Sequence, residues 1–126
     1  MNRSSLADRC ASHWRYRELL PIPDDAILPP LQVGWTPLCE VPPLAKHIGV
    51  RTLHLKDDGR NPSGSMKDRP SSIAAVLARA NRVPVVACAS TGNAASSLAG
   101  MAAATGLRSV IFLPEHAPEP KIAQLL

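Results

Sequence analysis

The feature that most limits the fold of this chain is the alternation of short apolar runs with helical runs from residue 52 onward. Strand-like runs alternate with helix-like runs over residues 52–56, 67–80, 83–89, 93–105, 109–113 and 120–126. Such an alternation indicates parallel strands joined by helical crossovers. The sequence therefore predicts an α/β fold, an open parallel sheet with flanking helices in the order βαβαβα.

Several boundaries of these elements carry their own signals. Gly49 follows a short helical run at 44–48, and Gly106 follows the alanine-rich run at 93–105, so both glycines are expected to end helices. Residues 83–89 are apolar and rich in β-branched side chains, which is typical of a buried parallel strand. Pro114 is placed to stop the strand expected at 109–113.

Residues 61–69 (NPSGSMKDR) bring one lysine, Lys67, to the start of the first long helix. Asn-Pro-Ser-Gly is a turn signal. The N-terminal end of a helix carries partial positive charge, so a lysine held there is pushed toward its neutral form. A neutral amine is the form that imine chemistry needs. The alternative is that Lys67 is a solvated surface lysine.

The residues after Lys67 refine this expectation. A proline is tolerated only in the first turn of a helix, so Pro70 requires the helix to begin near Met66 or Lys67. Asp68 is expected to be structural before it is catalytic, in an approximate capping box with Ser65. Arg69 is expected to meet either an acidic group or a phosphate.

Residues 56–69 (KDDGRNPSGSMKDR) resemble the cofactor-lysine motif of threonine synthases, which belong to the fold type II, tryptophan-synthase-β-like group of pyridoxal-phosphate enzymes. Residues 15–21 (RYRELLP) and 35–38 (WTPL) resemble segments near the start of the same enzymes. The resemblance implies that Lys67 forms a Schiff base with pyridoxal 5′-phosphate.

A second stretch, residues 90–93 (STGN), lies between an expected strand and the alanine-rich helix. Ligands of open parallel sheets bind at the carboxyl ends of strands, and helix N-termini attract anions. The stretch resembles the asparagine loop of fold type II enzymes. The resemblance implies that Ser90, Thr91, Gly92 and Asn93 form the substrate-binding loop, which holds the substrate carboxylate. It also implies that the side chain of Asn93 binds the ring hydroxyl of the cofactor. The alternative is that Asn93 caps a helix after a simple turn.

The implied reaction is a lyase reaction of threonine biosynthesis, in which the freed lysine moves protons at the substrate carbons. Phosphate leaves the γ-carbon of O-phospho-L-homoserine, and water adds at the β-carbon to give L-threonine. The implied partner is therefore a small amino-acid phosphate, and the full-length enzyme is expected to be a homodimer. Cysteate synthase, diaminopropionate ammonia-lyase and serine/threonine dehydratase remain alternatives, as does a non-catalytic truncated product.

Composition narrows the other classes of function. The net charge is +4, but the basic residues are scattered and aromatic residues make up only 3%, which argues against nucleic-acid binding. Three separated cysteines and four isolated histidines argue against a metal site or a disulfide framework. No apolar run is long enough to span a bilayer and no signal peptide is evident, so a cytoplasmic location is expected.

The chain has 126 residues and 13 prolines, several of them in residues 21–43. Residues 1–34 are expected to form a helical lead-in and a proline-rich connection. Residues 35–126 are expected to form the N-terminal portion of the cofactor-binding α/β domain. The enzymes that the chain resembles are about three times as long, so we expect this sequence to be catalytically incomplete.

Overall fold

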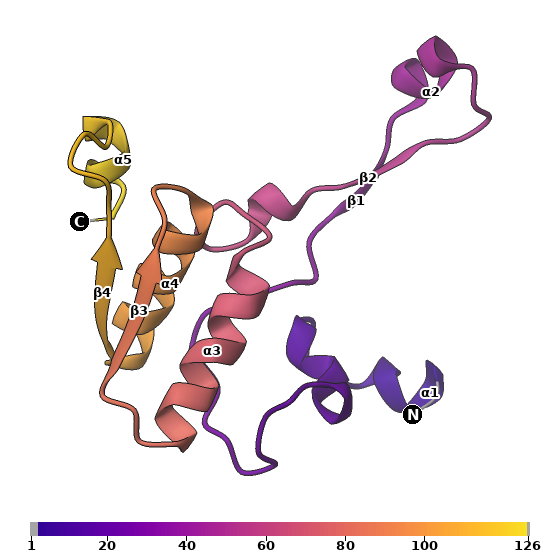
Figure 1. Ribbon diagram of the computed structural model, residues 1–126. Coiled ribbons are helices and arrows are strands. Elements are labelled where there is room, and N and C mark those ends of the chain that lie inside the picture. Colours follow the sequence, from indigo (N-terminus) through magenta and orange to yellow (C-terminus); the bar gives the residue numbers. More distant parts are fainter. Residues whose placement is uncertain (1–2, 126) are drawn as a thin grey trace.

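A computed structural model describes residues 3–125 and has the α/β architecture that the sequence predicts (Figure 1). The elements in chain order are α1 (Arg3–Ala7), η1 (His13–Leu19), β1 (Leu38–Glu40), α2 (Pro42–Ile48), β2 (His54–Lys56), η2 (Asp58–Arg60), α3 (Asp68–Ala80), β3 (Val85–Ala89), α4 (Asn93–Thr105), β4 (Arg108–Phe112) and α5 (Glu119–Ala123). Here η denotes a 3₁₀-helix. The expected helix at 120–126 is found as α5, and Leu126 lies outside the described residues.

The unit β3–α4–β4 is the parallel part of the fold. Strands β3 and β4 pair in parallel, in a register that runs from Val85 opposite Arg108 to Ala89 opposite Phe112. Helix α4 connects them and contacts both strands. It ends at Gly106, whose φ of 71° is the left-handed conformation that favours glycine. The predicted parallel pairing and the predicted helix end are both confirmed.

Strand β2 differs from the expectation. It was predicted as the first strand of the parallel sheet, but it pairs antiparallel with β1, with Leu38 opposite Lys56 and Glu40 opposite His54. The two strands form a sheet separate from β3 and β4. The physical reason is length and burial: each strand has three residues, all exposed, whereas a parallel strand inside a sheet needs cover on both faces.

Strands β1 and β2, with α2 between them, form an arm that extends away from the helices (Figure 1). Gly49 ends α2 with a φ of 76°, as the sequence predicts. One face of the β3–β4 sheet is also open, because Ala87, Ala89 and Phe112 are exposed. The expectation of a fully buried strand at 83–89 is therefore wrong for this chain.

Helices α3 and α4 lie side by side and carry the core (Figure 1). The two helices bury mostly alanine and serine, which lets their backbones approach closely. Met101 of α4 and Ala75 of α3 form a fully buried cluster with Val33. The proline-rich connection therefore contributes directly to the core, through Val33.

The lead-in lies against the same core. The backbone N–H of His13 in η1 donates to the carbonyl of Val33 at 2.8 Å. Ser12 begins η1 by accepting a hydrogen bond from the N–H of Trp14, and the helical turn ends before Pro21. The predicted helical lead-in is thus found as α1 and η1, while Met1 and Asn2 lie outside the described residues. Over residues 3–125, no helix has the length and apolar character needed to cross a membrane.

Candidate functional site

The turn at residues 61–64 is fixed to the rest of the molecule by the side chain of Asn61. Its Oδ1 accepts a hydrogen bond from the N–H of Gly34, and its Nδ2 donates to the carbonyl of Asp58, both at 2.9 Å. Gly64 closes the turn with a φ of 75°, a conformation that L side chains rarely adopt. The Asn-Pro-Ser-Gly signal therefore gives a rigid approach to the helix that follows.

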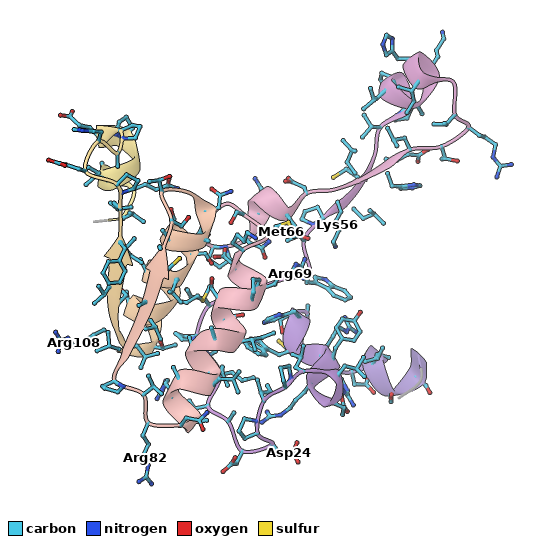
Figure 2. The ribbon with its side chains drawn as sticks, in the orientation of Figure 1. Asp24, Lys56, Met66, Arg69, Arg82 and Arg108 are labelled. Carbon is cyan, nitrogen blue, oxygen red and sulfur yellow. The ribbon has the colours of Figure 1, made fainter. Side chains whose placement is uncertain are left out.

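Lys67 lies at the N-cap of α3, as the sequence predicts. Its backbone N–H donates to Oγ of Ser65 at 3.2 Å, and its side chain is exposed. Within residues 3–125, no hydrogen bond or ion pair engages its amine. Met66 and Arg69 lie at the same end of α3, near the base of the arm where Lys56 lies (Figure 2). The amine of Lys67 is thus exposed and has no protein partner among the described residues.

Asp68 and Arg69 hold the start of α3 from two sides. The fully buried carboxylate of Asp68 accepts hydrogen bonds from the N–H and the hydroxyl of Ser63, at 2.7 and 2.6 Å. Nη2 of Arg69 lies 2.8 Å from Oδ1 of Asp58. The Asp68 side chain is therefore held by protein donors, but Ser63 takes the place expected for Ser65, whose only bond to Asp68 is to its backbone N–H. Of the two partners expected for Arg69, the structure shows the acidic one.

The charge of Asp58 is stabilised in this arrangement. Its Oδ1 also accepts a hydrogen bond from the hydroxyl of Thr36 at 2.6 Å. The hydrogen bond from Arg69, and next that from Thr36, lowers the pKa of Asp58 from its ordinary value. The turn η2 is therefore joined to both α3 and the segment before β1.

Residues 90–93 form the turn between β3 and α4. Oγ of Ser90 accepts a hydrogen bond from the N–H of Gly92 at 3.1 Å, and Gly92 is the N-cap of α4. Asn93 is the first residue of the helix and its side chain is exposed. The alternative in which Asn93 caps the helix is therefore wrong, although Ser90 does make the expected turn.

Residues 61–69 and residues 90–93 lie at the same end of the α3–α4 helix pair. The carboxyl end of β3 and the N-terminal ends of α3 and α4 lie together in Figure 1. A direct bond spans the two helices, because the hydroxyl of Ser97 in α4 donates to Oδ1 of Asp68 at 2.6 Å. Sequence reasoning did not identify Ser63 or Ser97. The only available signal for Ser97 was a polar residue within an alanine-rich helix.

A depression of about 410 Å³ adjoins the turn at 90–93. Its lining residues come from the carboxyl ends of β3 and β4 and the turns after them: Ala89, Ser90, Thr91, Phe112, Leu113 and Pro114. Lys67 and Asn93 are not among them. A second depression of about 300 Å³, lined by Ile27, Val76 and Arg79 among others, lies toward the other end of α3 and contains none of the predicted site residues. The described residues hold no cluster of three or more potential metal ligands.

His13 is a buried titratable residue that sequence reasoning also did not identify. Its Nε2 lies 3.2 Å from the hydroxyl of Ser72 in α3, and the side chain is 7% exposed. Burial, and then the charge of Arg69, lowers the pKa of His13 from its ordinary value to about 4. The lead-in therefore contacts the N-terminal half of α3, the helix that begins after Lys67.

Most of the chain is similar in sequence to known proteins. The pyridoxal-phosphate dependent enzyme family matches residues 30–126. The threonine synthase of Methanocaldococcus jannaschii is 39% identical over 115 residues, which cover 91% of this chain and 28% of the relative. That of Mycobacterium leprae is 42% identical over 100 residues, which cover 79% of this chain and 28% of the relative. The chain thus spans about 28% of the length of these curated relatives.

Solved structures show the same fold. The processed form of threonine deaminase isoform 2 from Solanum lycopersicum superposes with a TM-score of 0.63 at 25% sequence identity. The superposition covers 71% of this chain and 25% of that chain.

Proposed function

Since this chain belongs to the family of pyridoxal-phosphate dependent enzymes, whose cofactor is pyridoxal 5′-phosphate, we propose that it carries the cofactor lysine and the substrate loop of a threonine-synthase-type lyase. The observation that carries the proposal is the exposed amine of Lys67, free of partners among the described residues, at the start of α3. The similarity to threonine synthases supports this reaction over those of other members of the family.

The residues present fit the cofactor. A primary amine is the group that bonds covalently to its aldehyde, and Lys67 offers one. The turn at 90–93 adds the N-terminal end of a 13-residue helix, where the first N–H groups lack intrahelical partners. We assign the covalent attachment to Lys67 and the hydrogen bond to the ring hydroxyl to Asn93.

The substrate would bind beside the same turn. The hydroxyls of Ser90 and Thr91 would bind its carboxylate, because they lie at a helix N-terminus, and Gly92 would let the carboxylate approach the backbone closely. Ser90 and Thr91 also line the 410 Å³ depression, which leaves room for a small amino-acid phosphate. The substrate proposed is O-phospho-L-homoserine, which reacts with water to give L-threonine and phosphate.

The cofactor, when bound, supplies an electron sink for negative charge on the substrate carbons. Nζ of Lys67 would move protons at those carbons, because it is the amine at the start of α3. The hydrogen bond between Ser63 and Asp68 and the ion pair of Arg69 would hold the backbone of Lys67 in place while its side chain moves.

A spectroscopic experiment with the 126-residue chain tests the attachment. The chain is mixed with pyridoxal 5′-phosphate, its visible spectrum is recorded before and after borohydride, and the modified peptide is identified by mass spectrometry. We expect a visible band that borohydride removes and a modified peptide that contains Lys67. Lys67→Ala should abolish both.

Lys46→Ala is the matched control, because Lys46 is an exposed lysine of α2 on the arm. This variant should behave like the unaltered chain. Modification spread over several lysines, or a band that survives in Lys67→Ala, would reject the assignment. A folded chain that captures no cofactor would instead favour the non-catalytic alternative. Phosphate release from O-phospho-L-homoserine, compared with ammonia release from L-threonine, separates the synthase reaction from that of a dehydratase.

A further inference from the structure

The carboxylate of Asp68 is the most completely bonded buried charge that the described residues contain near the candidate site. The side chain is 0% exposed. It accepts three hydrogen bonds, from the N–H of Ser63, the hydroxyl of Ser63 and the hydroxyl of Ser97. A buried charge is stable only where such donors compensate for the loss of water. All three groups donate, which is the pattern that a carboxylate requires.

This one side chain joins three parts of the site. Asp68 directly follows Lys67 at the start of α3. Ser63 belongs to the turn that leads to Lys67, and Ser97 lies in the second turn of α4, four residues after Asn93. Oδ1 accepts from both serine hydroxyls, each at 2.6 Å, so the turn and α4 bond to the same oxygen atom.

We propose that Asp68 is a positioning residue, which sets the place of Lys67 relative to the turn at 90–93 by bonding to Ser63 on one side and Ser97 on the other. Any effect of Asp68 on catalysis at Lys67 rests on the proposed function. Asp68 acts through its neighbours, because a fully buried carboxylate with three protein donors has no contact with a ligand in the depression.

Helix capping alone does not account for the arrangement. An acidic residue in a first turn is favourable near the positive end of a helix, and the N–H of Ser63 would suffice to orient it. The bond from Ser97 comes from another helix and contributes nothing to that cap. Ser97 is therefore the residue whose removal separates positioning from capping.

Ser97→Ala tests the proposal, and Ser96→Ala is its matched control. Both serines are buried in α4, and alanine is the strongest helix former at either position. Only Ser97 bonds to Asp68. Ser97→Ala should therefore loosen the turn at Ser63 without breaking α4, whereas Ser96→Ala should leave that turn unchanged.

The first measurement needs no cofactor. Amide hydrogen exchange of the Ser63 N–H should become about tenfold faster in Ser97→Ala, as expected for the loss of one hydrogen bond to a charged group. The amides in the second half of α3 should exchange as before. Unchanged exchange at Ser63, or an equal acceleration of all protected amides, would overturn the proposal, because the bond would then be absent or would serve stability alone.

The second measurement is the affinity of pyridoxal 5′-phosphate for Lys67, from the visible band and borohydride trapping. We expect about a tenfold weaker capture in Ser97→Ala and unchanged capture in Ser96→Ala. Equal capture in all three chains would overturn the positioning role. If the unaltered chain captures no cofactor at Lys67, the proposed function fails, and the exchange measurement alone decides the role of Asp68.

Discussion

Arg69 and Asp58 join the first turn of α3 to the turn η2, through a distance of 2.8 Å between Nη2 and Oδ1. Nε of Arg69 also approaches Oδ2 of the same carboxylate, at 3.4 Å. Both side chains are about 30% exposed, so solvent weakens but does not remove the attraction. The pair therefore holds residues 61–67 between two fixed ends, of which one is η2 and the other is α3.

Asp58→Asn should destabilise the chain by about 1 kcal/mol at neutral pH, because Arg69 and Thr36 lose a charged acceptor. The pKa of Asp58 is lowered in the folded chain, so its contribution is present above the ordinary pKa of an aspartate, about 3.9, and is lost as the pH falls further. Urea unfolding should show a larger difference between variant and parent at pH 7 than at pH 3.

Asp25→Asn is the control for this charge change, because Asp25 is exposed in the proline-rich connection. It should leave the unfolding free energy within about 0.5 kcal/mol of the parent at both pH values. A loss of stability in Asp58→Asn that is as large at pH 3 as at pH 7 would show that the effect is not due to the charge.

His13 should make the stability of the chain depend on pH between about 6.5 and 4. The pKa of His13 is about 4 in the folded chain and about 6.5 in the unfolded chain. The unfolded chain therefore binds a proton first as the pH falls, so stability declines through this window, by on the order of 3 kcal/mol. The midpoint of urea unfolding, measured across the window, reports the decline.

His13→Gln should remove this part of the pH dependence, because glutamine does not titrate. His47→Gln is the control, since His47 is exposed on α2, away from the core. The control should keep the pH dependence of the parent. The same decline in His13→Gln as in the parent would assign the effect to other groups.

Much of the fold could be predicted because its signals are local. Gly49 and Gly106 each directly follow a helical run. Both adopt the left-handed conformation that ends a helix, so the glycine itself was the signal. The β3–α4–β4 unit follows from neighbouring runs in the chain, so its pairing needs no distant information. Lys67 begins a helix because a turn precedes it and Pro70 allows no earlier regular turn.

The features that could not be predicted depend on residues far apart in the chain. The pairing of β2 with β1 is set across α2, and three exposed residues give no pattern that identifies a partner. His13 meets Ser72 across 59 residues, and Ser97 meets Asp68 across 29. Such bonds lack a local signature, because serine is common on helix surfaces and its partner is fixed only by how the helices lie together.

Gly34→Ala should destabilise the chain by about 3 kcal/mol. Gly34 has a φ of 78°, which costs about 1–2 kcal/mol for a residue with a Cβ. The added Cβ would also lie 2.8 Å from Nη1 of Arg69 and 3.0 Å from the backbone N of His13, which forces the lead-in away from α3. Urea unfolding measures the loss.

Gly49→Ala is a matched control for the backbone part of this effect. Gly49 has nearly the same φ, 76°, but no atom lies within 4 Å of the position of an added Cβ. Gly49→Ala should lower the free energy of unfolding by only about 1 kcal/mol. Equal losses in the two variants would mean that the lead-in moves aside freely, and would contradict the close approach of His13 and Arg69 to Gly34.

Asn93→Ala should weaken cofactor capture without changing stability. Gly92 is the N-cap of α4, so the loss of the Asn93 amide should alter the unfolding free energy by less than about 0.5 kcal/mol. If Asn93 binds the ring hydroxyl as proposed, the affinity for pyridoxal 5′-phosphate should fall about fivefold, the effect of one neutral hydrogen bond. Spectroscopic titration and urea unfolding measure the two quantities.

Asn81→Ala should show the opposite pattern. The amide of Asn81 donates to the carbonyl of Leu77 at 2.8 Å, at the end of α3 that lies away from Lys67. Its removal should cost about 0.5 kcal/mol of stability and leave cofactor capture unchanged. If Asn93→Ala lowers stability instead and captures the cofactor as well as the parent does, then Asn93 supports the helix, and the cofactor's ring hydroxyl must be bound by another residue.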